Sequence, residues 1–222
     1  DLDGSGNLTT FLGVNPEKLE VTVYNALLQD GVSLDDVKLS AIKHNVDLIP
    51  ADNDLYAAEQ ALSTLDDRNF ILVDLLENAS GTYDYILIDC GPSMGLLQIN
   101  AWIAAHGIII PIDSSNKALH GVKGLLNRIR PLQENRRLNP NLKIRGFLLT
   151  HFDRRNKHCQ EVADSMRGHF KESVFDAVIP HTVRFKEATV GGQAINEYWP
   201  DHEAAKAYLE LAKEVLHGDK AK

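Results

Sequence analysis

The sequence predicts an α/β protein built on a doubly wound, mostly parallel sheet with helices on both faces. Two observations lead to this prediction. Short apolar runs that end in Gly, Pro or Asp alternate with longer stretches in which apolar residues recur at helical spacing. This alternation continues along the whole chain, as in proteins with a parallel sheet. Because no repeat or linker divides the sequence, we expect a single domain over residues 1–222.

The clearest predicted strand covers residues 83–89, where the apolar run Tyr85–Ile88 ends in Asp89. An unbroken apolar run predicts a strand that is buried on both faces of a parallel sheet. A carboxylate at the end of such a strand lies at the ligand-binding edge of the sheet, and in nucleotide hydrolases it holds Mg²⁺. Since Asp before Gly and Pro also makes a good turn, the residues alone leave both interpretations open. Further strands are expected at residues 45–50, 107–112, 144–150 and 174–179.

The stretches between the strands have the apolar spacing of amphipathic helices. Helical segments are expected at residues 22–28, 34–39, 54–65, 68–77, 95–105, 118–129, 159–170 and 201–216. Arg130 and Pro131 are expected to close the helix before them, because proline disrupts a helix interior. We expect loops at residues 1–10 and 180–192, and a loose tail at residues 217–222.

Composition restricts the class of protein. The chain is 44% hydrophobic and 24% charged with a net charge of −8, which is typical of a soluble globular domain and argues against a generally basic nucleic-acid coat. A local basic patch remains compatible with that charge. Cys90 and Cys159 are the two cysteines, which favours a reducing, cytoplasmic setting. We find no apolar run of membrane-spanning length, no signal peptide and no histidine pair with metal-ligand spacing.

Several blocks of the sequence, in order, resemble the ParA/Soj family of chromosome- and plasmid-partitioning ATPases, which are relatives of the division-site regulator MinD. The block around Asp89 resembles the family segment Tyr-Asp-x-Ile-x-Ile-Asp-x-Pro-Pro-Ser. The opening block resembles its Asp-x-Asp-Pro-Gln-Gly-Asn segment. The matching blocks are Asp1–Thr10, Val46–Glu59, Tyr83–Asn100, Leu149–Asn156, Val178–Ala188 and Tyr208–Val215. Together they cover nearly the whole chain and imply a fold of the P-loop ATPase type.

The resemblance also implies roles for individual residues around a bound ATP and Mg²⁺. Asp89 matches the Walker B aspartate, which reaches the Mg²⁺ ion. Asp3 matches the catalytic aspartate that positions the attacking water, a role that suits phosphoryl transfer, because its catalysis is mostly positioning and charge stabilisation. Pro180 and Thr182 match a loop that packs around the adenine base. Without the resemblance, Asp3 would be interpreted as an ordinary loop acid.

Two arginines match family positions that bind the DNA backbone without sequence preference, namely Arg155 and Arg184. Arginine suits this task because its planar guanidinium offers a fork of donors to phosphate and keeps its charge. Arg154, Lys157 and Lys186 stand close in sequence and could widen the patch. Most basic clusters of this kind are solvated surface, so the membership of the patch stays open.

The family resemblance implies a switch that dimerises on ATP, binds non-specific DNA, and hydrolyses ATP when a centromere-binding ParB-type partner stimulates it. Such a protein is cytoplasmic and associated with the nucleoid. One alternative is a MinD-like ATPase that cycles on and off a membrane, which predicts a basic amphipathic C-terminal helix. Residues 211–217 have mixed charge, which disfavours contact with a membrane. A further alternative is a nucleotide-free interaction module derived from the family.

The sequence departs from the family pattern at the phosphate-binding motif. Gly-x-x-x-x-Gly-Lys-Ser/Thr does not occur in the 222 residues, and in the family it precedes the segment that matches Asp1–Thr10. We therefore expect this chain to lack that N-terminal unit, and the 222 residues alone neither to bind nor to hydrolyse ATP appreciably. Smaller departures place Gly4 and Gly91 where the family has proline, which is expected to soften the loops near the nucleotide.

Overall fold

The computed structural model describes residues 1–43, 45–77, 79, 81–114 and 118–220. These residues form two compact units. The first unit comprises residues 1–105 with 189–193, and the second comprises residues 106–188 with 194–222. The expectation of one domain over residues 1–222 stays a prediction.

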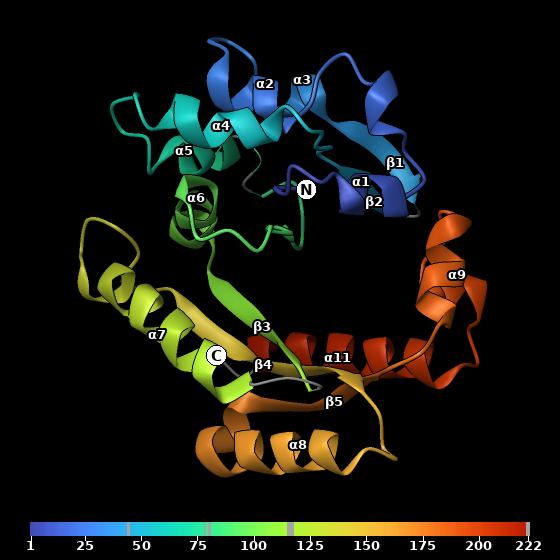
Figure 1. Ribbon diagram of the computed structural model, residues 1–222. Helices are drawn as coiled ribbons and strands as arrows, with labels where there is room; N and C mark the ends of the chain where they lie inside the picture. The colour runs from blue at the N-terminus through green and yellow to red at the C-terminus, as the bar shows by residue number, and fades with distance from the viewer. Residues whose placement is uncertain (44, 78, 80, 115–117, 221–222) are drawn as a thin grey trace. The chain divides into compact units, whose positions relative to one another are not determined.

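The second unit is built on the three-stranded sheet β3 (Gly107–Asp113), β4 (Lys143–Phe152) and β5 (Val174–Pro180). The strands lie in the order β3-β4-β5 and both pairs are parallel, which confirms the predicted α/β class. Because side chains alternate along a strand, Phe147 and Leu148 face opposite sides of the sheet. Phe147 packs on Phe170 at the end of α8 (Lys157–Phe170), with ring centroids 4.4 Å apart. Leu148 belongs to the cluster that packs against α11 (Glu203–Lys220), so these two helices cover opposite faces (Figure 1).

Helix α7 (Ala118–Glu134) continues through Pro131, so the prediction that Arg130 and Pro131 close this helix is wrong. Its last turns carry Ile129 and Leu132, which are fully or nearly fully buried. Burial of two large aliphatic side chains contributes several kcal/mol by area, on the order of the cost of proline in a helix interior. Tertiary packing therefore outweighs the local penalty.

The segment expected to be a loop at residues 180–192 contains α9 (Arg184–Val190), and α10 (Ile195–Tyr198) follows it. Both helices are short, and their stability comes from packing, since Ala188 and Ile195 are buried together with Ala204 and Ala205 at the start of α11. At the other end, α11 runs to Lys220, so residues 217–220 are helical where a loose tail was expected. Residues 221–222 of that tail lie outside the described residues.

The first unit consists of short helices around a main apolar cluster and a smaller one of Ala26, Leu34 and Val37, with a hairpin at its side (Figure 1). The hairpin pairs β1 (Leu39–Lys43) with β2 (Val46–Leu48) in antiparallel orientation. Strand β2 agrees with the strand expected at residues 45–50, while β1 was not expected. Leu55, Leu62, Leu97 and Ala101 are among the core residues. The elements are α1 (Asn7–Phe11), α2 (Val23–Leu28), α3 (Leu34–Val37), β1 (Leu39–Lys43), β2 (Val46–Leu48), α4 (Leu55–Leu62), α5 (Ile71–Glu77) and α6 (Leu96–Ala104), with 3₁₀ turns at Pro16–Lys18 here and Lys171–Ser173 in the second unit.

Residues 83–89 do not form the buried strand that the sequence predicts. Leu87 is 85% exposed and Ile86 is 47% exposed. Within the described residues, the one β-pairing of this region is the single parallel bridge between Leu2 and Cys90. A strand becomes buried on both faces only when a sheet extends on its sides and helices cover it, and the described chain supplies no such sheet here. None of the described helices is both long and apolar enough to cross a bilayer.

Candidate functional site

The structure places Asp3 beside the segment that begins at Asp89. The backbone N–H of Leu2 donates to the carbonyl oxygen of Asp89 at 2.7 Å, next to the parallel bridge between Leu2 and Cys90. The Asp3 carboxylate accepts a hydrogen bond from the backbone N–H of Ser5 at 3.0 Å, which fixes its direction. Two carboxylates that are 86 residues apart in sequence therefore share one edge of the first unit.

The loop that carries Asp3 is held to the core by a buried network. Thr9 donates to the Asp1 carboxylate through its backbone N–H at 2.9 Å and through its hydroxyl at 2.8 Å. The same hydroxyl accepts a hydrogen bond from the backbone N–H of Ala51 at 3.0 Å. Because Thr9 is fully buried and Asp1 is 9% exposed, water competes little with these bonds, and the start of the Asp3 loop is rigid.

Two glycines at positions where the family has proline leave space that other side chains fill. A Cβ added at Gly91 would lie 3.0 Å from Oδ1 and 3.1 Å from Cγ of Asp3, so the Asp3 carboxylate occupies the space beside Gly91. A Cβ added at Gly4 would lie 2.8 Å from Cγ of Tyr56, so the Tyr56 ring covers Gly4. Each glycine is thus packed against a neighbouring side chain in this structure.

Partial burial raises the pKa values of both Asp89 and Cys90. Although Asp89 reaches the surface, the surrounding chain removes part of the water from its carboxyl group and raises its pKa. The Asp3 carboxylate adds to this rise. Burial and the Asp89 carboxylate raise the pKa of the Cys90 thiol to about 11. Cys90 is therefore a thiol at neutral pH and a poor nucleophile.

Carboxylate oxygens are ligands that Mg²⁺ prefers, so Asp3 and Asp89 have suitable chemistry for a site of this kind. Mg²⁺ usually takes one or two protein carboxylates and completes its shell with water and substrate phosphates. Nowhere in the described parts of the chain do three or more His, Cys, Asp or Glu side chains gather in a geometry that could hold a metal. The residues present fit a Mg²⁺ ion that is held jointly with a nucleotide.

Glu59 of α4 fixes the start of α6, the helix that follows Asp89, although no motif in the sequence marks this residue. Its carboxylate accepts hydrogen bonds from the backbone N–H groups of Leu96 at 2.6 Å and Leu97 at 3.2 Å, at the start of α6. A carboxylate at this place satisfies two of the N–H groups that a helix leaves unpaired and interacts favourably with the helix dipole. A Cβ added at Gly95 would meet both Glu59 oxygens, so a side chain at this position would displace the Glu59 carboxylate from the start of α6.

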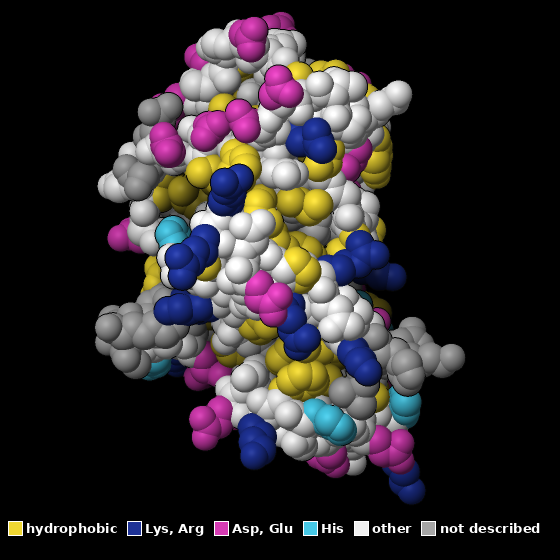
Figure 2. Space-filling view, turned by 90° about the vertical axis from the view of Figure 1, so that its left-hand side faces the viewer, with side chains coloured by type: hydrophobic (Ala, Val, Ile, Leu, Met, Phe, Trp, Pro, Cys, Tyr) yellow, Lys and Arg dark blue, Asp and Glu magenta, His cyan; other side chains and the backbone are white. Residues whose placement is uncertain are grey.

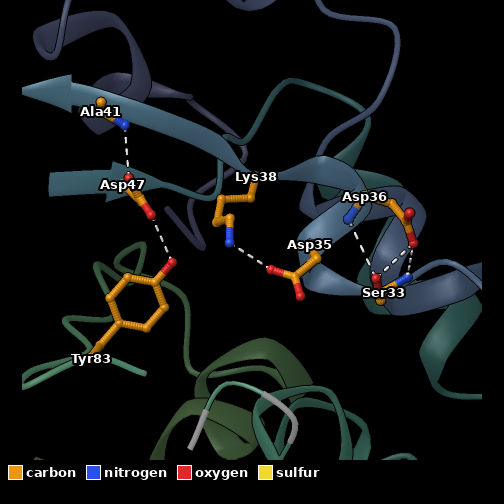
Figure 3. Close-up of polar contacts among 7 residues, drawn as sticks. All are labelled: Ser33, Asp35, Asp36, Lys38, Ala41, Asp47 and Tyr83. Atoms are coloured by element: carbon orange, nitrogen blue, oxygen red, sulfur yellow. Dashed lines mark hydrogen bonds and ion pairs between the residues drawn. The ribbon is translucent and has the colours of Figure 1, made fainter. Parts of the chain in front are cut away.

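A second anchor holds the start of the 83–89 segment (Figure 3). The Tyr83 hydroxyl donates to Asp47 at 2.8 Å, and the other oxygen of Asp47 accepts from the backbone N–H of Ala41 at 2.7 Å. Lys38 bonds Asp35 at 2.6 Å, and its Nζ lies 5.9 Å from the centroid of the Tyr83 ring. Tyr83 thus ties this segment to the hairpin β1–β2.

The remaining predicted site residues belong to the second unit and lie where β4 and β5 end. Phe152 pairs with Pro180, so the turn containing Arg155 and the loop containing Thr182 leave the same edge of the sheet. The Thr182 hydroxyl accepts from the backbone N–H of Arg184 at 3.3 Å, at the start of α9. The carboxyl edge of a parallel sheet is the general location of ligand sites in open α/β proteins.

Arg184 makes contacts that the sequence did not predict. Its Nη1 lies 2.9 Å and 2.6 Å from the two carboxylate oxygens of Glu187. Its guanidinium carbon lies 4.8 Å from the centroid of the Trp199 ring. The ion pair with Arg184 lowers the pKa of Glu187. Glu187 stands one helical turn after Arg184, which the sequence could have suggested, whereas the contact with Trp199 is tertiary.

On the face that Figure 2 shows, Lys and Arg side chains lie among acidic and hydrophobic side chains. This distribution agrees with the net charge of −8. The structure thus brings Asp3 together with Asp89 in the first unit. It brings Pro180, Thr182, Arg155 and Arg184 to one sheet edge in the second.

The chain is similar to several known proteins. A family model described as an AAA domain matches residues 1–144. The Soj sporulation initiation inhibitor protein of Bacillus subtilis (strain 168) is 40% identical over 97% of this chain and 84% of its own length. The chromosome partitioning protein ParA of Myxococcus xanthus (strain DK1622) is 36% identical over 100% of this chain and 77% of its own. A crystal structure of cobyrinic acid a,c-diamide synthase from Mycobacterium smegmatis with bound ADP and magnesium superposes with a TM-score of 0.83, at 32% identity over 99% of this chain and 81% of that one.

The parallel sheet and its structural neighbours define an α/β protein of the P-loop ATPase type. Among such proteins, the identity with Soj and ParA over nearly the whole chain is specific. This chain belongs to the ParA/Soj family of partitioning ATPases, as its ordered sequence blocks indicated.

Proposed function

We propose that the protein is an ATP-dependent DNA-partitioning ATPase that dimerises on ATP and hydrolyses it when a centromere-binding partner stimulates the reaction. The observation that supports this best is the juxtaposition of Asp3 and Asp89 through the Leu2–Asp89 hydrogen bond, in a chain that is 40% identical to Soj. The nucleotide hydrolysis acts as a timer, because its product is a change in dimer and DNA state.

In this proposal Asp89 holds Mg²⁺ and Asp3 orients the attacking water. When bound, Mg²⁺ neutralises charge on the nucleotide phosphates. The Ser5 N–H holds the Asp3 carboxylate in one direction, and the buried Asp1–Thr9 bonds hold the loop behind it. This rigidity suits a group whose task is to position a water molecule. Pro180 and Thr182, at the end of β5, are proposed to contact the adenine base.

Non-specific DNA is the second proposed ligand, with Arg155 and Arg184 contacting phosphates from neighbouring loops. Contacts of this kind neutralise phosphate charge and release counterions, so the affinity should fall steeply with salt. The protein would act in the cytoplasm on the nucleoid, with a ParB-type protein as the stimulating partner. Whether it serves a chromosome or a plasmid does not alter the chemistry.

The DNA contact is tested by titration of a fluorescent duplex of arbitrary sequence, in the presence of Mg²⁺ and ATP, with a protein in which a strand, phosphate-binding loop and helix are fused before Asp1. We expect binding that weakens as salt rises, and a salt slope that is shallower by about one unit in Arg155→Ala and in Arg184→Ala. Lys18→Ala, an exposed cation of the first unit, is the matched control. Binding that responds to neither arginine would contradict the proposal.

Nucleotide turnover is tested separately, because the 222 residues contain no Gly-x-x-x-x-Gly-Lys-Ser/Thr motif. We expect no appreciable ATP hydrolysis by these residues alone. Turnover should appear when a strand, phosphate-binding loop and helix are fused before Asp1, and should be lost again in Asp89→Asn. Hydrolysis by the unfused chain would refute the expected inactivity, and an active fused Asp89→Asn variant would refute the role of Asp89.

A further inference from the structure

Arg184 sits in a cluster of four side chains on α9 and α10 and the residue that follows α10. Glu187 contacts its Nη1 with both carboxylate oxygens, at 2.9 Å and 2.6 Å. Trp199 lies under the guanidinium at 4.8 Å, and the Tyr198 hydroxyl donates to Glu187 at 3.2 Å. Arg184 and Glu187 are each 39% exposed as side chains, so solvent and ligands can reach both.

The hydrogen bonds from Arg184 to Glu187 come from one guanidinium nitrogen, Nη1. Both oxygens of Glu187 converge on Nη1, so this carboxylate does not form the two-nitrogen fork that an arginine can offer. A phosphate that binds bidentately uses one of the two N–H forks of the guanidinium, Nε–Nη2 or Nη1–Nη2, and Glu187 meets the second of these through Nη1. The carboxylate also cancels the charge that attracts phosphate. Glu187 and a phosphate therefore compete for Arg184.

Trp199 does not compete in this way. A cation–π contact uses the face of the guanidinium and none of its N–H donors, so Arg184 can keep this contact while its N–H groups change partner. The Tyr198 hydroxyl gives Glu187 a hydrogen bond that is independent of Arg184. When a phosphate replaces Glu187, Arg184 would thus keep its contact with Trp199, and the Glu187 carboxylate would keep its hydrogen bond from Tyr198.

From this geometry we infer that Glu187 and Trp199 are positioning residues that set the phosphate affinity of Arg184. Glu187 weakens binding by occupying Nη1 in the DNA-free protein, and Trp199 strengthens it by holding the guanidinium plane in place. This inference rests on the proposed DNA binding and assigns residues that control it. The ligand is the phosphate backbone of duplex DNA.

The test uses the protein with the strand, phosphate-binding loop and helix fused before Asp1. It measures the affinity for a fluorescent duplex DNA, with Mg²⁺ and ATP present and absent, from about 50 to about 200 mM salt. Glu187→Gln should bind about threefold more tightly and show a steeper salt slope, since an exposed ion pair of this kind corresponds to a few-fold effect. Glu210→Gln is the matched control. Glu210 forms an exposed ion pair with Lys213, three residues later on α11, and the substitution removes the same single negative charge. Trp199→Ala should bind about two- to fivefold more weakly, and Trp199→Phe should retain most of the affinity.

A double-mutant cycle separates positioning from a general charge effect. In the Arg184→Ala background, both Glu187→Gln and Trp199→Ala should leave the affinity unchanged, because their partner is gone. The inference is overturned if Glu187→Gln behaves like Glu210→Gln, or if its effect persists without Arg184. Wild-type protein that binds DNA and is weakened by Arg184→Ala would show that the proposed function stands even in that case. A wild type with no salt-dependent DNA binding would overturn both.

Discussion

Removal of the Glu59 carboxylate should destabilise the first unit, and the size of the effect can be estimated from the structure. Glu59 is half-buried and accepts two hydrogen bonds from the first N–H groups of α6, at 2.6 Å from Leu96 and 3.2 Å from Leu97. Loss of a helix-capping group costs about 0.5–2 kcal/mol, and a hydrogen bond to a charged group contributes about 1.5–3 kcal/mol. Because the 3.2 Å bond is long, we expect the free energy of unfolding to fall by about 2 kcal/mol in Glu59→Ala.

In Glu59→Gln the free energy of unfolding should fall by about half as much as in Glu59→Ala, because the amide keeps one oxygen acceptor but carries no charge. Urea unfolding followed by circular dichroism should place the midpoint of Glu59→Ala about 1 M lower, for a slope of about 2 kcal/mol/M. Amide hydrogen exchange at Leu96 and Leu97 should accelerate by about 30-fold, the factor that corresponds to about 2 kcal/mol. Glu20→Ala, an exposed glutamate of the same unit, is the control. If Glu59→Ala and Glu20→Ala unfold at the same urea concentration, the capping argument is refuted.

Three further predictions concern the consecutive residues Asp89, Cys90 and Gly91. The raised pKa of Asp89 means that its ionised form costs stability in the folded state, so Asp89→Asn should be more stable than wild type at pH 7. That difference should shrink as the pH falls through the raised pKa and disappear below about 4, near the ordinary aspartate value; a difference that grows in acid would contradict the reasoning. Iodoacetamide should label Cys90 slowly at pH 7 and about tenfold faster per pH unit towards its pKa of about 11, with fast labelling at neutral pH as the contrary result. Gly91→Ala should displace the Asp3 carboxylate, which carbonyl-detected NMR of Asp3 would report, and an unchanged Asp3 signal would show that the loop accommodates the methyl group.

The candidate site was only partly accessible from the sequence. The resemblance to the partitioning ATPases named Asp3 and Asp89, but their proximity depends on the hydrogen bond from Leu2 to Asp89. Glu59 was missed because its partners are backbone N–H groups 37 and 38 residues away, and no side-chain motif marks such a bond. Trp199 was missed for a related reason, since only the packing of the segment after α10 near α9 brings it under Arg184.

Apolar periodicity by itself determined the strands β3, β4 and β5 and most of the longer helices, because each of these elements must bury one recurring set of side chains. Three features were decided only by the tertiary structure. Helix α7 passes through Pro131 because Ile129 and Leu132 are buried, and α9 and α10 form because Ala188 and Ile195 pack on α11. The segment 83–89 has the composition of a buried strand but lies exposed, because burial of a strand depends on neighbours distant in sequence, and periodicity within the strand carries no information about them.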